Sequence, residues 1–326
     1  MMKKEDLRIV FMGTPEFAVG TLQRLVEGGY RVVAVVTQPD KPVGRHQDTL
    51  QPSQVKLYAQ AKGLPVLQPI KMKDPEFVEQ LRSFQADLQV VVAFRMLPEV
   101  VWAMPRFGTF NVHAALLPQY RGAAPINWAV INGETQTGVT TFFLDKDIDT
   151  GRIILQKPFE IPDTADVEYV YDGLMHLGAE ICLETLEKIV AADGLPESMP
   201  QAELEGRFKQ LYGAPKLNKQ VCEINWNRPC KRIYDFIRGL SPYPGAWTTL
   251  LGPNGKEVVL KIFKTAKTDR NVGMRPGTIV VYKGLLYITT ADCMLRIDEL
   301  QLAGKNRMNA RDFLNGNKNI ENYIIK

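Results

Sequence analysis

LRIVFMGTPEFA, residues 7–18, is the stretch that decides the fold. Apart from Arg8, its first half is a continuous apolar run, which predicts a buried strand at 7–12, and Gly13-Thr14-Pro15 then turns the chain into a helix. Proline suits the start of a helix because its missing N–H has no helical partner there in any case. A second apolar strand is expected at 31–37. Strands that are apolar throughout, in a β-α-β unit, predict a parallel sheet covered on both faces.

Strands and helices continue to alternate after this unit. We expect a first domain at 1–193 of the α/β class, with a Rossmann-like, mostly parallel sheet. Only the first glycine of the dinucleotide-binding pattern G-x-G-x-x-G is present, as Gly13, and this argues against bound NAD. Further helices are expected near 52–62, 74–84, 125–132 and 166–192, and further strands near 88–93, 107–113, 137–144 and 152–156.

The sequence pattern changes after residue 193. Residues 194–214 contain several prolines and glycines, which predict a linker or an ordered crossing arm. A short helix near 228–239 and five short strands follow, and together they predict an OB-like β-barrel domain at 215–326. These strands are expected at 246–251, 257–265, 277–282, 285–290 and 294–302.

The composition is that of an ordinary folded protein. The chain has 326 residues, of which 45% are hydrophobic and 23% charged, and its longest apolar runs have the length of a strand. The N-terminal residues lack the apolar core of a signal peptide, and the four cysteines form no C-x-x-C pair. We therefore expect a cytoplasmic protein with neither a zinc site nor a disulfide framework.

Charge is distributed unevenly along the chain. The formal net charge is +4, but residues 206–326 hold 21 Lys and Arg against 9 Asp and Glu, and residues 1–205 hold 19 against 27. This asymmetry suggests that the second half binds a polyanion; a solvated surface of no function is the alternative. Basic and aromatic side chains on the expected barrel favour nucleic acid, through phosphate contacts and base stacking: Lys256, Lys261, Lys264, Lys267, Arg270, Tyr282 and Tyr287.

Asn111 and His113 are the strongest candidates for a catalytic site. The chain has only three histidines, and His113 stands two residues after Asn111 at the end of an expected strand. Alternation places both side chains on one side of that strand, at the edge where open α/β folds hold their sites. With the carboxylate of Asp149, they can stabilise an oxyanion and move protons without a metal or a covalent nucleophile. The pattern therefore predicts group transfer; a structural histidine is the alternative.

Three loops give weaker signals. Asp145, Asp147 and Asp149 alternate as in a calcium loop, but the central Gly and the closing Glu are absent. The loop at 40–46 could contact a phosphate or be an ordinary surface loop. Residues 119–128 could let a substrate approach closely, or could merely cap a helix.

Taken together, the motifs resemble those of the folate-dependent formyltransferases, within them the branch that acts on methionyl-tRNA. The resemblance covers nearly the whole chain and rests on a specific order of motifs. They are Gly13–Ala18, Gln38-Pro39-Asp40 with Gly44-Arg45, Asn111-Val112-His113, Leu116-Leu117-Pro118, Arg121–Ile126, Asp149-Thr150-Gly151, and Lys216-Leu217 with Ile224-Asn225-Trp226.

This resemblance implies roles for individual residues. The catalytic residues would be Asn111, His113 and Asp149, and the formyl donor would be 10-formyltetrahydrofolate. Two departures from the family pattern concern the folate site, because Ala115 stands where Ser is common and Phe94-Arg95 replaces the usual Tyr-Gly. The folate site would be lined by Ala115, Leu116, Leu117, Pro118, Leu144 and Asp145. The tRNA would be bound by Lys41, Arg45, Arg121, Lys216, Lys261 and Lys264.

The reaction that the resemblance implies is formyl transfer to the amino group of initiator methionyl-tRNA, for translation initiation. A formyltransferase of amino sugar nucleotides would share the catalytic residues, and a purine-pathway formyltransferase would need only the first domain. A tRNA-binding protein without activity is a further alternative. The basic second half favours tRNA, and the complete set of catalytic residues favours an enzyme. We expect it to act as a monomer, with no metal.

Overall fold

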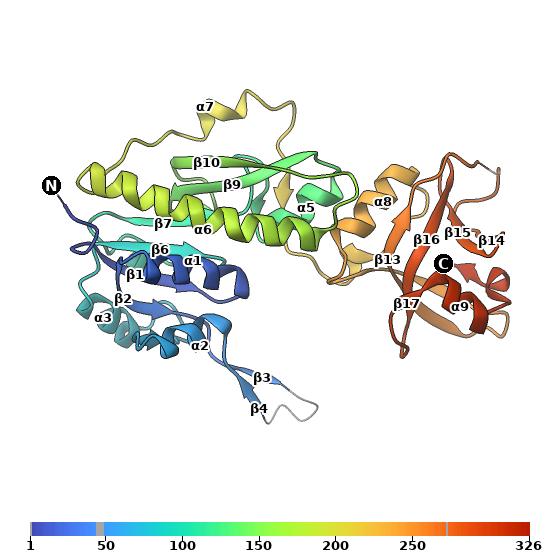
Figure 1. The fold of residues 1–326 in the computed structure, drawn as a ribbon, viewed down its shortest axis with the longest axis horizontal. Helices are drawn as coiled ribbons and strands as arrows, with labels where there is room; N and C mark the ends of the chain where they lie inside the picture. Colours follow the sequence, from blue (N-terminus) through green and yellow to red (C-terminus); the bar gives the residue numbers. More distant parts are fainter. Residues whose placement is uncertain (1, 44–48, 272) are drawn as a thin grey trace. The chain divides into compact units, whose positions relative to one another are not determined.

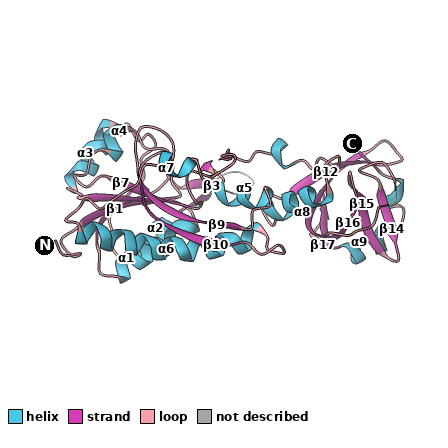
Figure 2. Cartoon of the chain, turned by 90° about the horizontal axis from the view of Figure 1, so that it is seen from above, coloured by secondary structure: helices cyan, strands magenta, loops and turns pink. Residues whose placement is uncertain are grey.

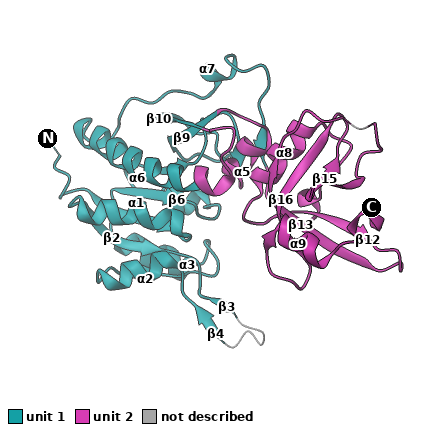
Figure 3. Ribbon diagram, turned by 45° about the vertical axis from the view of Figure 1, so that its right-hand side comes forward, with its two compact units in different colours: residues 1–122, 136–160, 171–214 teal, residues 123–135, 161–170, 215–326 magenta. Residues whose placement is uncertain are grey.

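The computed structural model describes residues 2–43, 49–271 and 273–326. The chain forms two compact units, coloured separately in Figure 3. Unit 1 comprises residues 1–122, 136–160 and 171–214, and unit 2 comprises residues 123–135, 161–170 and 215–326. This division does not test the domain limits predicted at 193 and 214, which stay predictions. Among the described residues, no helix combines the length and apolar character needed to cross a membrane.

Unit 1 is built on a seven-stranded sheet. In spatial order its strands are β10 (Ile153–Glu160), β9 (Gln136–Phe143), β7 (Thr109–His113), β6 (Leu88–Val92), β1 (Arg8–Gly13), β2 (Arg31–Val36) and β5 (Val66–Leu67). The five strands from β7 to β5 are parallel, and β9 is antiparallel to both of its neighbours. β6 is buried along its whole length, as a central parallel strand should be. The predicted α/β class with a mostly parallel sheet is confirmed.

Helices cover both faces of this sheet (Figures 1 and 2). Helices α1 (Glu16–Glu27) and α6 (Val167–Ala191) lie on one face, and α2 (Gln54–Ala61) contacts α1. Helices α3 (Pro75–Ser83) and α4 (Glu99–Trp102) lie on the other face. There Phe77 and Leu81 of α3 join a buried cluster with Val10 and Met12 of β1. The periodic apolar residues of the helices thus meet the apolar strands, and burial of this area stabilises the unit.

Short paired segments organise the loops of unit 1. Strands β3 (Lys41–Val43) and β4 (Thr49–Gln51) form an antiparallel pair, and β8 (Arg121–Gly122) pairs in parallel with β11 (Gly213–Ala214). Residues 194–214 also contain α7 (Ala202–Glu205), so this segment is an ordered arm. An ideal Cβ at Gly122 would lie 2.5 Å from the carbonyl oxygen of Ala214, at a φ of +129°. Only glycine fits where the arm meets β8.

Unit 2 contains an antiparallel sheet and a buried helix. Ile233 and Ile237 of α8 (Cys230–Gly239) share one apolar core with Leu260 and Ile262 of the sheet. Helix α5 (Pro125–Ile131) packs on α8, and α9 (Ala310–Gly316) packs on the sheet. The 3₁₀ turns are η1 (Gln220–Cys222) and η2 (Ile320–Asn322). In spatial order the strands are β14 (Ile279–Tyr282), β15 (Leu285–Thr289), β16 (Met294–Leu302), β13 (Glu257–Ala266), β12 (Ala246–Leu251) and β18 (Ile324–Ile325), and β17 (Met308–Asn309) pairs with β16.

The sheet of unit 2 curls until its two edges approach each other. The backbone N–H of Val281, on β14, donates to the Glu321 carboxylate at 2.8 Å, close to β18. An ideal Cβ at Gly277 would lie 3.6 Å from the Cβ of Ile325. Within the described residues, no ladder of hydrogen bonds joins β14 to β18. The predicted antiparallel β domain is confirmed, and its curl is that of an OB-like barrel.

Candidate active site

Strand β7 places Asn111 and His113 at its carboxyl end. Asn111 is opposite Val91 of β6 on one side and Phe142 of β9 on the other, and His113 is opposite Thr140. Because residues two apart in a strand point to the same face, the two side chains share one face of the sheet. They lie where the central parallel strands end, which is the usual place for a site in an open α/β sheet.

His113 is buried and has two distinct ring nitrogens. Its Nε2 lies 2.9 Å from the carbonyl oxygen of Tyr120. A carbonyl can only accept, so Nε2 carries a hydrogen and donates it. The other nitrogen, Nδ1, lies 3.9 Å from Oδ2 of Asp149. The Tyr120 carbonyl therefore orients the ring and leaves Nδ1 as the nitrogen that can exchange a proton.

Asp149 sits in the loop between β9 and β10, in a left-handed conformation with φ 55°. Its Oδ2 accepts a hydrogen bond of 2.9 Å from the backbone N–H of Gly122. Two residues later, an ideal Cβ at Gly151 would lie 1.7 Å from the carbonyl oxygen of Phe143, so this position requires glycine. The close approach of Gly151 to β9 and the N–H of Gly122 together aim the carboxylate at His113.

Asn111 has a polar atom without a protein partner. Its Oδ1 is buried and makes no hydrogen bond to any residue that the structure describes. Buried polar atoms almost always have a partner, and a catalytic role or a bound molecule is one explanation of an exception. The amide of Asn111 is therefore a candidate for direct contact with a substrate.

The residues expected to bind folate lie next to this strand. The Thr140 hydroxyl donates to the Ala115 carbonyl at 2.6 Å and accepts from the Leu117 N–H at 3.1 Å. Leu117 is buried in a cluster against which Leu144 packs. Pro118 is also buried, Leu116 is half-buried and Asp145 is exposed. Two backbone groups of this segment are already bonded within the protein, so it would contact a ligand mainly through its apolar side chains.

Arg95, which departs from the family pattern, is tied to a neighbouring loop. Its guanidinium donates to the backbone oxygens of Pro69 and Ile70, and it lies over the Phe94 ring at 5.7 Å from the ring centre. Burial lowers the pKa of this guanidinium. The two carbonyl oxygens compensate part of the desolvated charge.

The residues expected to bind tRNA are spread over both units. In unit 1, Lys41 is exposed on β3, and Arg45 lies outside the described residues. Arg121 of β8 donates to Gln201 at 2.7 and 3.0 Å and to Glu205 at 3.1 Å, so its guanidinium is engaged by the arm. In unit 2, Lys216 and Lys264 are exposed, and Lys261 Nζ donates to the Pro244 carbonyl at 2.9 Å. The tRNA-binding roles of all six residues remain predictions.

Sequence reasoning missed the contacts of the arm with the site. Gln119 donates to the Gln210 carbonyl at 2.8 Å and accepts from the Tyr212 N–H at 2.8 Å. Gln201 is 3% exposed and bonds to both loops that surround His113 and Asp149. Gln119 opens one of the loops singled out in the sequence, but Gln201 belongs to no motif. The partners of both glutamines lie 50 to 93 residues away in sequence, so no local pattern indicates these contacts.

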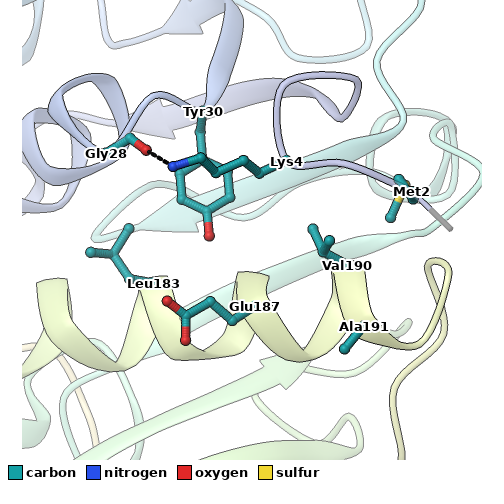
Figure 4. Close-up of a pocket in the computed structure, with 8 residues that line it drawn as sticks. All are labelled: Met2, Lys4, Gly28, Tyr30, Leu183, Glu187, Val190 and Ala191. Atoms are coloured by element: carbon teal, nitrogen blue, oxygen red, sulfur yellow. Dashed lines mark hydrogen bonds between the residues drawn. The ribbon is translucent and has the colours of Figure 1, made fainter.

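A cavity of about 380 Å³ lies at the opposite end of the sheet (Figure 4). It adjoins Tyr30, just before the amino end of β2, whereas the candidate site is at the carboxyl end of β7. Lys4 Nζ donates to the Gly28 carbonyl at 2.8 Å. Burial and the charge of Glu187 raise the pKa of Tyr30 to about 12. The cavity is separate from the candidate active site.

Comparison with known families gives two matches. The model of the family described as "Formyl transferase" matches residues 7–186. The model described as "Formyl transferase, C-terminal domain" matches residues 216–318. Together they cover most of the chain.

Similar proteins extend this comparison over the full length. The chain is 58% identical, over 325 residues, to the methionyl-tRNA formyltransferase of Parabacteroides distasonis, covering 99% of this chain and 100% of that protein. It is 57% identical to the methionyl-tRNA formyltransferase of Phocaeicola vulgatus, covering 100% of both. The crystal structure of HypX from Aquifex aeolicus in complex with tetrahydrofolic acid matches with a TM-score of 0.60 and 19% identity, over 94% of this chain and 47% of that one. At this identity the last comparison concerns the fold alone.

Proposed function

The chain belongs to the formyl transferase family, and from this premise we propose that it transfers a formyl group to the α-amino group of methionyl-tRNA, for translation initiation. Two relatives that share more than half of its residues over the full length are methionyl-tRNA formyltransferases. The observation that carries the chemistry is the pairing of His113 Nδ1 with Asp149 Oδ2, 3.9 Å apart at the carboxyl end of β7. The active site then consists of Asn111, His113 and Asp149.

Each of these side chains has a role that follows from its bonds. His113 commits Nε2–H to the Tyr120 carbonyl, and Nδ1 is left to take up and return a proton of the acceptor amine. Asp149 keeps an ionisable oxygen beside Nδ1 and orients the ring. The side-chain amide of Asn111 donates to the oxygen on which negative charge develops during acyl transfer. All three groups act by hydrogen bonds and charge, and none forms a covalent bond to the substrate.

The donor that fits this site is 10-formyltetrahydrofolate. When bound, it supplies the formyl carbon and a leaving nitrogen that takes a proton. Ala115, Leu116, Leu117 and Pro118, with Leu144 and Asp145 across from them, would hold its ring system. The fit is supported by the apolar side chains of this segment and by the unpartnered buried Oδ1 of Asn111 beside it. Arg95 donates to the backbone carbonyls of Pro69 and Ile70, so these two bonds hold its guanidinium against the neighbouring loop.

The acceptor is an RNA, and the basic second half of the chain is suited to it. Lys216 and Lys264 are exposed and available to phosphates, and in the same unit the Arg270 guanidinium lies 4.9 Å from the ring centre of Tyr282. Positive charge and exposed rings favour binding of a nucleic acid backbone and its bases. Lys41 and Arg45 would approach the acceptor end, and Arg121, Lys261 and the rest of the basic surface would contact the remainder. We propose that one chain suffices for one tRNA.

Removal of single catalytic side chains tests this assignment. Asn111→Ala should lower kcat by roughly 10²–10³, which is the usual cost of one lost donor to a developing oxyanion. His113→Ala should lower it by roughly 10²–10⁴, which is the usual contribution of a positioned acid–base group. The KM for methionyl-tRNA should change far less, because the RNA contacts are elsewhere. His176→Ala, at an exposed position of α6, is the matched control and should leave kcat unchanged. Near wild-type turnover in either site variant would contradict the assignment.

A further inference from the structure

We propose that Gln201, in the arm, is a positioning residue that holds the two loops carrying the partners of His113. The proposal rests on the function proposed above. It concerns a buried amide outside every motif. Gln201 is 3% exposed and lies just before α7, 52 residues from Asp149 in sequence.

The hydrogen-bonding capacity of the Gln201 amide is fully used. Its Nε2 donates to the carbonyl oxygens of Asp149 at 2.8 Å and Gly151 at 2.9 Å. Its Oε1 accepts from Arg121 Nε at 3.0 Å and Nη2 at 2.7 Å. A side-chain amide has two donor hydrogens and two acceptor positions, and all four are satisfied here. Such a network fixes the groups that it joins.

Through its donor nitrogen, Gln201 binds the loop that carries the Asp149 carboxylate. Asp149 has a positive φ, which is uncommon for a residue other than glycine and depends on support from its surroundings. The carbonyls on either side of Thr150 are both bonded to the same Nε2. The two peptide planes are thereby fixed, and with them the direction in which the Asp149 side chain leaves the backbone.

Through its acceptor oxygen, Gln201 binds the loop that orients the His113 ring. Arg121 lies between Tyr120, whose carbonyl bonds His113 Nε2, and Gly122, whose N–H bonds Asp149 Oδ2. One amide thus joins the segment 120–122, which bonds both His113 Nε2 and Asp149 Oδ2, to the backbone of the loop that carries Asp149. The 3.9 Å separation of that pair depends on both.

The chemistry of the contact requires glutamine. Glutamate would still accept from Arg121, but it would place carboxylate oxygens against the carbonyls of Asp149 and Gly151. Leucine would keep the volume and lose all four bonds, leaving Arg121 and two carbonyls without these partners. Both substitutions release the Asp149 loop and preserve the size of the side chain.

Steady-state kinetics of Gln201→Leu and Gln201→Glu, with methionyl-tRNA as substrate, test the proposal. A misplacement of about 1 Å can cost roughly 10²-fold in rate, so we expect kcat to fall by about 10- to 100-fold. The KM for methionyl-tRNA should change far less than kcat, because Arg121 keeps its bond to Glu205 at 3.1 Å. The assay is run well below the unfolding temperature of each variant. Glu203→Ala is the control, because Glu203 is an exposed residue of α7 in the same arm, two residues after Gln201. It should leave kcat unchanged.

A double-mutant cycle separates positioning from general stability. If Gln201 acts through Asp149, then adding Gln201→Leu to Asp149→Asn should lower kcat much less than it does in the wild type. Additive losses, or a wild-type kcat in both Gln201 variants, would overturn the proposal. Failure of the proposed function looks different, because the unmodified protein would then transfer no formyl group to methionyl-tRNA at all.

Discussion

Substitution of Gly151 by alanine should disable the active site without touching any side chain in it. An ideal Cβ at this position would lie 1.7 Å from the carbonyl oxygen of Phe143, whereas ordinary contacts begin at 3.4 Å. The obstacle is backbone that belongs to β9, so it cannot rotate away. The loop and the strand must therefore separate by a further 1.7 Å.

This displacement acts directly on the Asp149 carboxylate. Gly151 is two residues from Asp149, and the backbone carbonyls of both residues are bonded to Gln201. A displacement of Gly151 should therefore also displace the Asp149 carboxylate that faces His113. A shift of about 1 Å can cost roughly 10²-fold, and we expect Gly151→Ala to lower kcat by about 10²-fold or more. Overpacking should also lower the free energy of unfolding by about 1–3 kcal/mol.

The assay is steady-state formyl transfer to methionyl-tRNA, with thermal unfolding measured on the same preparations. Gly206→Ala is the matched control, because nothing lies within 4 Å of its ideal Cβ and its φ of −64° suits alanine. It should keep both kcat and unfolding temperature. A Gly151→Ala variant that folds and keeps kcat within about threefold of the wild type would refute the reasoning that a displaced loop costs this much.

Three further outcomes are expected. The N–H of Cys230 at the start of α8 donates to Asp292 at 2.7 Å and, as the largest cause, holds the pKa of that carboxyl below its usual 3.8. Asp292 is exposed and solvent screens its charge, so Asp292→Ala, which removes this bond to the helix start, should lower the free energy of unfolding by about 0.5–1 kcal/mol at neutral pH. A carboxyl whose pKa is lower in the folded than in the unfolded protein stabilises the fold at pH values above the unfolded-state pKa, and this stabilisation is lost as the pH falls through the folded-state pKa. The free energies of unfolding of the two proteins, measured by chemical denaturation, should therefore converge in acid. A difference between them that does not change with pH would contradict this prediction. Burial raises the pKa of Cys182, and raises that of Cys230 to about 12. Both thiols should therefore resist an alkylating reagent at neutral pH until the protein is denatured. Prompt labelling of either cysteine in the native protein, detected by mass spectrometry, would contradict this prediction. Lys264→Ala should weaken tRNA binding and reduce the slope of log affinity against log salt by about 1, with kcat at saturation unchanged; an unaltered slope would remove this residue from the RNA surface.

The main elements could be predicted because their residues repeat at the period of their own structure. β1 and β2 are apolar after their first residue, β6 is apolar apart from Gln89, and the predicted helix at 166–192 corresponds to α6 at Val167–Ala191. The short pieces carry no such period. The β8–β11 pair consists of two residues on each side, and it depends on a close approach between Gly122 and Ala214 that no local pattern encodes.

The same distinction applies to the site. Asn111 and His113 could be paired from the sequence because strand alternation is local, and the structure shows both at the end of β7. The hydrogen bond from Gln201 to the Asp149 carbonyl could not be predicted, because Gln201 lies in a segment without periodicity, 52 residues away in sequence. For Arg121, the sequence suggests a role but does not show the bonds that the side chain already makes. A basic residue in a glycine-rich loop suggests an RNA contact, but sequence does not reveal that its guanidinium is already bonded to Gln201 and Glu205.

The most direct test of the central claim is the transfer of labelled formyl from 10-formyltetrahydrofolate by the wild-type protein. Methionine-charged initiator tRNA and an amino sugar nucleotide are offered in parallel, with His113→Ala as the inactive reference. We predict label on the tRNA, none on the sugar nucleotide, and loss of the signal in the variant. Label on the sugar nucleotide alone, or on neither acceptor, would contradict the proposed function.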